Sequence, residues 1–136
     1  MNLIVNMKNL VFPFLFLLVL STAFSCKKEE GEGGQAKILG RVYSYDVNKS
    51  LQKTDSGYIA DARVFIAYGT EGMVDNDTRT SFDGSFEFKW LQKGVYTVWV
   101  VGQCDTCPAG QTIDSVQVLI SDKKQSVATR DLITYY

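Results

Sequence analysis

The sequence has 136 residues, enough for a single domain. Its 14 basic and 15 acidic side chains nearly balance, so no basic field is available to attract a nucleic-acid backbone and we expect no nucleic-acid partner. The chain contains no histidine, which removes the commonest general base and the commonest metal ligand together.

Residues 1–25 have the pattern of an export signal. Lys8 supplies a positive start, and the apolar run that follows is too short to span a bilayer. The run ends in Ala23-Phe24-Ser25-Cys26, and small residues directly before a cysteine resemble the lipobox of bacterial lipoproteins. That resemblance implies that Cys26 is acylated and becomes the first residue of the mature chain. An ordinary signal with an incidental Cys26 is the alternative, and translation can start at Met1 or at Met7.

Residues 26–35 form the expected tether between the lipid and the domain. The nine residues after the cysteine include no apolar side chain, so this stretch has nothing to bury and should be flexible. A charged, acidic stretch at this place resembles the surface-export signal of some Gram-negative lipoproteins, although a plain solvated spacer would look the same. Lys27, directly after the cysteine, is unlike an inner-membrane retention signal. We therefore expect outer-membrane anchoring, with the domain either periplasmic or exposed at the cell surface.

The folded domain is predicted to span 36–136 and to be all-β. Short runs that alternate apolar and polar residues, or that are rich in β-branched and aromatic residues, recur about every ten residues with turn formers between them. Seven strands in an antiparallel sandwich of two sheets fit this pattern. They are expected over 38–43, 62–68, 77–82, 85–91, 95–101, 115–121 and 127–134, with loops over 46–57, 69–76 and 102–112 and no helix.

The stretch 80–98 organises the predicted core. Asp83-Gly84 is a strong turn signal, because glycine takes the positive φ that side chains avoid. Phe86, Phe88 and Trp90 then fall on one face of a strand with period 2, and the next strand carries Tyr96. We expect Phe86, Phe88, Trp90 and Tyr96 to be buried.

Four short motifs suggest a family. They are Ile38-x-Gly40-x-Val42, Ala60-Asp61-Ala62-x-Val64, Thr80-x-x-x-Gly84-x-Phe86 and Leu91-x-x-Gly94-x-Tyr96-x-Val98. Together they resemble the carboxypeptidase regulatory-like, or prealbumin-like, β-sandwich domains, over about residues 38–101. The resemblance implies a seven-stranded Greek-key sandwich. Its motifs are turn glycines and inward aromatics, so they predict a fold and leave the function open.

Cys104 and Cys107 form an even pair once Cys26 is assigned to the lipid. In an oxidising compartment a disulfide that rigidifies its loop is expected. The spacing also occurs in thioredoxin-type redox pairs, but those need a helix N-terminus that an all-β pattern does not supply. A zinc site would need further ligands that the chain lacks, so we expect neither a metal nor a cofactor.

Tyr43, Phe65 and Trp99 are the candidate ligand residues. If the aliphatic residues on either side of them face the core, these rings face outward. On neighbouring strands they would form an exposed platform suited to sugar rings or to a protein partner. Alternatively, the rings cover one another or pack under the 46–57 loop.

The sequence as a whole predicts a non-enzymatic lipoprotein. Without histidine, a Ser-His-Asp triad is impossible, and no nucleophile and base converge in the pattern. The expected role is a binding or accessory display module at the outer membrane, with an unidentified protein or glycan partner. The alternative is a carbohydrate- or peptide-binding module that uses the outward aromatic residues.

Overall fold

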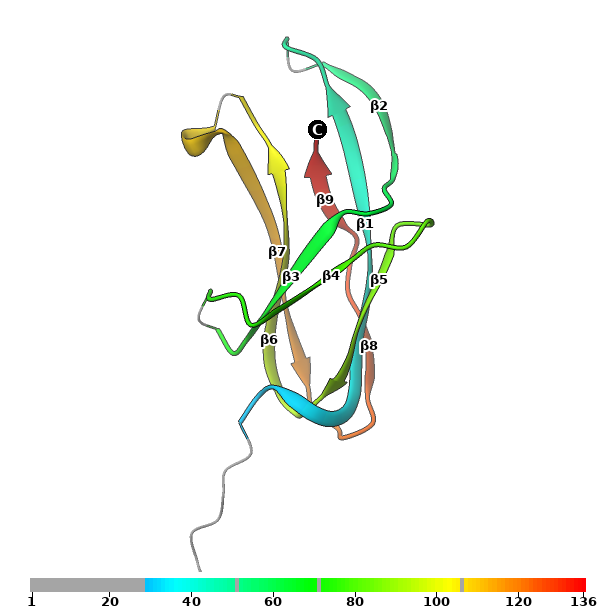
Figure 1. Cartoon of the computed structure of the whole chain (residues 1–136), viewed down its shortest axis with the longest axis vertical. Coiled ribbons are helices and arrows are strands. Elements are labelled where there is room, and N and C mark those ends of the chain that lie inside the picture. The colour runs from blue at the N-terminus through cyan, green and yellow to red at the C-terminus, as the bar shows by residue number, and fades with distance from the viewer. Residues whose placement is uncertain (1–28, 51, 71, 106) are drawn as a thin grey trace, which may run out of the picture.

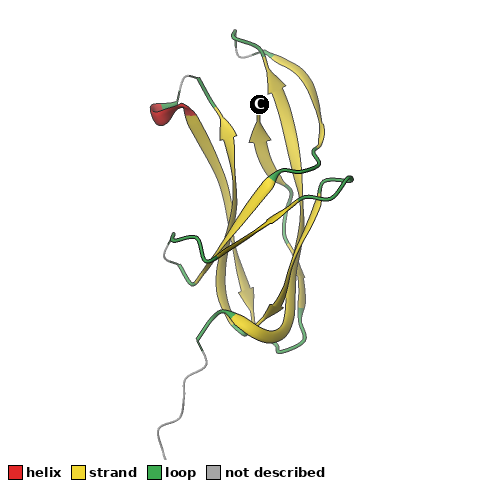
Figure 2. Cartoon of the chain, viewed as in Figure 1, coloured by secondary structure: helices red, strands yellow, loops and turns green. Residues whose placement is uncertain are grey.

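A computed structural model of the chain describes residues 29–50, 52–70, 72–105 and 107–136. The signal segment and Cys26 lie outside the described residues. The described part folds into two β-sheets that face each other (Figures 1 and 2). One sheet contains β1 (Glu32–Val47), β2 (Lys53–Tyr58), β5 (Ser85–Leu91), β8 (Ser126–Ala128) and β9 (Leu132–Tyr135). The other contains β4 (Asn76–Arg79), β3 (Arg63–Tyr68), β6 (Gly94–Gln103) and β7 (Gln111–Ile120), in that spatial order.

The all-β sandwich is confirmed, but the described residues contain nine strands, two more than predicted, and one of the sheets is mixed. β1 pairs antiparallel with β2 and β5, and parallel with β8 and β9. The last predicted strand is interrupted, and its halves β8 and β9 run side by side with successive parts of β1. The prediction of a purely antiparallel sandwich is therefore wrong.

β2 lies, except for its last residue Tyr58, within the stretch 46–57 that was predicted as a loop. Its residues are polar or exposed because it is the outer strand of a hairpin with β1, so its pairing depends on the backbone and leaves little trace in hydropathy. β1 also starts at Glu32, before the expected domain start at residue 36. A single 3₁₀ turn, η2 (Pro108–Gly110), interrupts the connection from β6 to β7. Within the described residues, no helix has the length and apolarity needed to cross a membrane.

The core lies between the two sheets and contains the residues that the sequence motifs place inward. Phe86, Phe88 and Tyr96 are at most 5 % exposed, as predicted. Phe86 needs Gly40 beneath it, because a Cβ at that glycine would lie 2.4 Å from the Phe86 ring. The other large side chains that are fully buried are β-branched or leucine: Ile38, Val42, Val64, Ile66, Leu91, Val98, Val100, Ile120, Leu132 and Thr134.

Trp90 is not in the core, and the prediction that it is buried is wrong. Its side chain is 67 % exposed, while Leu91 is buried in its place. Between the cross-strand pairs Phe88–Ile38 and Leu91–Ala36, β5 has two intervening residues and β1 has one. The extra residue makes a β-bulge, and Trp90 has a φ of +61° there. The bulge reverses the alternation that the sequence pattern assumes.

The hydroxyl of Tyr96 closes the end of the sandwich at which the chain enters. It donates to the backbone oxygen of Gln92 at 2.9 Å and accepts from the backbone N–H of Gly31 at 3.0 Å. Burial raises the pKa of Tyr96. The neutral hydroxyl therefore ties the first described residues to the turn between β5 and β6.

Candidate functional site

The structure divides the three candidate ligand residues between two faces. Tyr43 lies on β1 between the buried Val42 and Ser44, so it points outward from the five-stranded sheet. Phe65 on β3 and Trp99 on β6 point outward from the four-stranded sheet. Because the core separates these two faces, the three rings do not form one platform.

Phe65 and Trp99 are direct cross-strand partners and cover each other. Their ring centroids are 5.7 Å apart with an angle of 22° between the planes, and both side chains are half-buried. The guanidinium carbon of Arg63 lies 5.2 Å from the Phe65 ring centroid. On its other side Trp99 pairs with Ser115, which is too small to cover an indole. The mutual covering foreseen as an alternative therefore describes this pair, with part of the Trp99 ring still accessible.

The outward surface of β6 and β7 around Trp99 is uncharged. Four cross-strand pairs make it up: Val95–Leu119, Thr97–Gln117, Trp99–Ser115 and Val101–Ile113. Leu119 and Ile113 are 64 % and 65 % exposed. An uncharged sheet face with exposed aliphatic residues is typical of an interaction surface.

A second aromatic group, here called the tyrosine cluster, lies on the outer face of the five-stranded sheet. The Tyr43 ring makes edge contacts with the rings of Tyr58 and Tyr45, at centroid distances of 5.2 and 5.3 Å. The Tyr135 ring stacks on the Tyr45 ring at a centroid distance of 5.8 Å. Two cations lie over the cluster. Lys53 Nζ lies 3.5 Å from the centroid of the Tyr45 ring, and the Arg41 guanidinium carbon lies 4.0 Å from the centroid of the Tyr58 ring. The cluster consists of Tyr43, Tyr45, Tyr58 and Tyr135.

The tyrosine cluster adjoins a cavity at one end of the sandwich, here called the loop-end pocket. The cavity has a volume of about 320 Å³, which lies in the range of small-molecule sites, roughly 300–1,000 Å³. Tyr135 belongs to both the cluster and the pocket wall, and Lys53, which lies over the Tyr45 ring, also lines the pocket. The full lining is Val47, Asn48, Lys49, Lys53, Gln103, Cys104, Asp105, Cys107, Thr112, Tyr135 and Tyr136.

Backbone hydrogen bonds fix one wall of the loop-end pocket. Val47 N donates to Tyr136 O at 3.0 Å, and Tyr136 N donates to Tyr45 O at 3.2 Å, so the chain after β9 stays beside β1. The Asn48 carboxamide oxygen accepts from the backbone N–H groups of Ser50 and Gln52, at 2.9 and 3.0 Å. These two hydrogen bonds stabilise the turn at the rim of the pocket and fix the Asn48 side chain within it.

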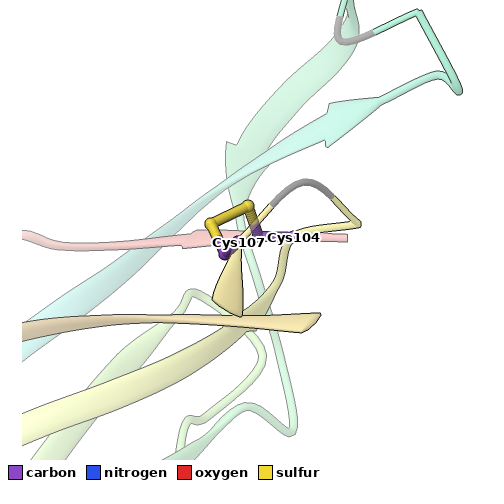
Figure 3. The surroundings of a disulfide bond; sticks show 2 residues. All are labelled: Cys104 and Cys107. Atoms are coloured by element: carbon purple, nitrogen blue, oxygen red, sulfur yellow. A yellow bond between two sulfur atoms is a disulfide. The ribbon is translucent and has the colours of Figure 1, made fainter. Parts of the chain in front are cut away.

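The opposite wall carries the disulfide between Cys104 and Cys107 (Figure 3). The predicted pairing is therefore present, in the connection from β6 to β7. Cys104 N also donates to Gly110 O at 3.0 Å, which closes the same loop through the backbone. Since neither cysteine stands at the start of an α-helix, the bond acts here as a brace for the rim.

No group of three or more acidic or cysteine side chains gathers in the described residues in a way that could hold a metal ion. The acidic residues near β4 are engaged elsewhere. Asp75 accepts from the backbone N–H of Tyr68 at 2.7 Å, and Asp77 accepts two hydrogen bonds from Arg63 at 2.9 and 3.0 Å.

The sequence did not reveal the tyrosine cluster or the pocket. Tyr58 is the last residue of β2, a strand that was not predicted, and Tyr135 lies on β9, whose pairing with β1 is parallel and distant in sequence. Alternation on the first predicted strand did place Tyr43 outward, and Tyr45 follows two residues later on the same face of β1. Extending the same period to residues 132–135 would have placed Tyr135 outward as well.

Comparison with known proteins gives a distant structural neighbour. No family model matches the sequence. No curated protein matches it either. The fold is similar to a crystal structure from Pseudomonas aeruginosa, of a protein to which carbohydrate binding is provisionally assigned. The two share 15 % sequence identity with a TM-score of 0.43, over 74 % of this chain and 90 % of the other.

Proposed function

We propose that this protein is a lipid-anchored, non-enzymatic module that binds a saccharide in the loop-end pocket. The observation that supports it is the composition of that cavity, in which Tyr135 and Tyr136 meet amide, hydroxyl and charged side chains. Aromatic rings bind the apolar faces of sugar rings, and polar side chains around them bind the hydroxyl groups. The prealbumin-like sandwich serves as the rigid support.

The position of the pocket fits an anchor at Cys26. The first described residues lie beside the start of β6, because the Gly31 N–H donates to the Tyr96 hydroxyl, and the pocket lies at the other end of the same strand, at Gln103. Ten residues of strand span roughly 30 Å at about 3.3 Å each. An acyl chain on Cys26 would therefore hold the pocket at the far end from the membrane, in the periplasm or at the cell surface.

Binding to a glycan array tests the proposed site. Wild-type protein solubilised in detergent should bind at least one class of glycan, and Tyr136→Ala should weaken that binding by about thirtyfold or more, as loss of an aromatic anchor worth 2 kcal/mol would. Leu119→Ala, an exposed apolar residue on the other sheet, is the matched control and should bind as the wild type does. If Tyr136→Ala binds glycans as strongly as the wild type does, the loop-end pocket is not the binding site.

Anchoring is tested on the same protein by detergent phase partitioning. The wild type should enter the detergent phase, and Cys26→Ser should stay in the aqueous phase or be misprocessed. An intact mass that shows an unmodified thiol at Cys26 would contradict the anchor.

A protein partner is the second candidate function, and the uncharged face of β6 and β7 favours it. In that role the domain would be an accessory subunit that docks through Trp99, Ile113 and Leu119. Crosslinking in intact membranes distinguishes the two functions, because a partner lost with Ile113→Asp but kept with Tyr136→Ala belongs to this face.

A further inference from the structure

Trp90 is held outside the core at a conformational cost. Its φ of +61° lies in the left-handed region, which residues with bulky side chains rarely adopt. β-Bulges of this kind re-aim side chains, and strained backbone of this kind clusters at ligand sites. Here the bulge turns an indole outward to 67 % exposure, where a smaller or polar residue would serve solubility better.

The exposed indole lines a groove, here called the Trp90 groove, together with residues of β5 and β4. These two strands belong to different sheets (Figure 1). The groove has a volume of about 420 Å³. Glu32, Tyr68 and Asn76 line it together with Trp90, and they come from three other strands, β1, β3 and β4. The indole is therefore part of a concave site with polar walls.

The polar groups in the groove are already oriented. Asn76 Nδ2 donates to Glu32 Oε1 at 2.8 Å, and the Tyr68 hydroxyl donates to the same oxygen at 3.3 Å. Gln92 Nε2 donates to the backbone oxygen of Glu32 at 2.7 Å, which fixes the strand that carries the carboxylate. Burial, followed by the charge of Glu32, raises the pKa of Tyr68, so its hydroxyl remains a donor.

Most of the charge in the groove is neutralised. Asp77 is paired with Arg63 at 2.9 Å, and Glu87 is paired with Lys37 and Lys89 at 3.1 and 2.9 Å. No basic side chain pairs with Glu32 within the described part of the chain. The groove thus presents four groups to a ligand and carries little net charge. They are the indole of Trp90, the carboxylate of Glu32, the carboxamide of Asn76 and the phenol of Tyr68.

We infer that the Trp90 groove is a second saccharide site, separate from the loop-end pocket. The indole would stack on the C–H face of a pyranose ring. The fixed carboxylate of Glu32 and the amide of Asn76 would bind adjacent hydroxyl groups, as planar polar side chains do for paired donors and acceptors. The ligand class follows the proposed function, but the site does not depend on the loop-end pocket.

The two sites make the domain bivalent. They lie near opposite ends of the sandwich, because Glu32 and Gln92 stand beside the start of β6 and the loop-end pocket stands beyond its end. Two weak sites on one domain engage a polysaccharide, or two chains of it, with an avidity that neither site reaches alone.

Intrinsic fluorescence tests the inference, because the chain has two tryptophans. In the full-length Trp99→Phe variant in detergent, Trp90 is the sole emitter. It is titrated with cellohexaose, xylohexaose, mannohexaose and chitohexaose. At least one of these should shift its emission to the blue and reduce its quenching by acrylamide. Glu32→Gln should then weaken the response at least tenfold without changing the unliganded spectrum, and Phe82→Ala, an exposed aromatic in the turn after β4, should leave it unchanged.

The outcomes separate the two sites. A glycan that binds the wild type on the array while Trp90 emission stays unchanged overturns the second site and leaves the proposed function standing. A Trp90 response that persists in Tyr136→Ala supports an independent site, whereas one lost in that variant overturns independence. A response given instead by tetramethylammonium and abolished by salt would identify a cation site, which contradicts the inference. No response by either measure rejects the second site and the proposed function together.

Discussion

Replacing Trp90 by glycine should make the domain more stable than replacing it by alanine. Alanine keeps the Cβ that is disfavoured at a φ of +61°, at about 1–2 kcal/mol, whereas glycine removes this cost. Glycine in a strand also loses about 0.5–1 kcal/mol in conformational entropy relative to alanine. The difference favours Trp90→Gly by up to about 1.5 kcal/mol. Because the side chain is exposed, lost packing contributes little to either variant.

Lys89 provides the control, since it precedes Trp90 on β5, is exposed and has an ordinary negative φ. Both Lys89→Gly and Lys89→Ala remove its ion pair with Glu87, so their difference isolates the backbone. There the order should reverse, with glycine less stable than alanine by about 0.5–1 kcal/mol. Urea unfolding followed by circular dichroism measures all four variants. If Trp90→Gly is the less stable of its pair, as at Lys89, the left-handed bulge is refuted.

Three further predictions concern stability. Phe86→Ala should lower the unfolding free energy by about 3–5 kcal/mol, whereas Phe82→Ala, at 97 % exposure, should change it by less than about 0.5, and similar losses at both would contradict the core assignment. Replacing Cys104 and Cys107 by serine should lower it by about 2 kcal/mol with the fold retained, and turnover in an insulin-reduction assay would overturn the structural role. Hydrogen bonds from Arg130 hold the pKa of Asp114 below its usual range. The stability that this carboxylate contributes is therefore present above about pH 4 and lost as the pH falls through the folded-state pKa. Asp114→Asn should make the unfolding free energy depend less on pH in that window.

Local signals predicted those parts of the fold that depend on neighbours in sequence. β5 was predicted at its observed bounds, because the Asp83-Gly84 turn fixes where the strand begins. Gly84 has the expected positive φ of 78°, and a Cβ there would lie 2.8 Å from the Tyr58 side chain. Turn chemistry and inward aromatics are short-range, so a single sequence records them.

Long-range pairing could not be predicted in the same way. The parallel contacts of β8 and β9 with β1 join residues about ninety positions apart, and either orientation suits their alternation. The bulge at Trp90 escaped for a related reason, because Trp90 continues the alternation of Phe86 and Phe88 and only the register against β1 reveals the extra residue. The bulge moved Trp90 from the core to the surface, and the pairing of β9 with β1 brought Tyr135 into the tyrosine cluster, so the candidate site was the least predictable part.

Mapping a bound glycan onto the protein by NMR shows directly whether the loop-end pocket binds a saccharide. ¹⁵N-labelled full-length protein in detergent is titrated with the glycan that binds most strongly on the array. We expect the largest amide shifts around the loop-end pocket, at Asn48, Lys49, Gln103, Asp105 and Tyr136. Shifts confined to the outward face of β6 and β7, or no shifts at saturating glycan, would contradict it.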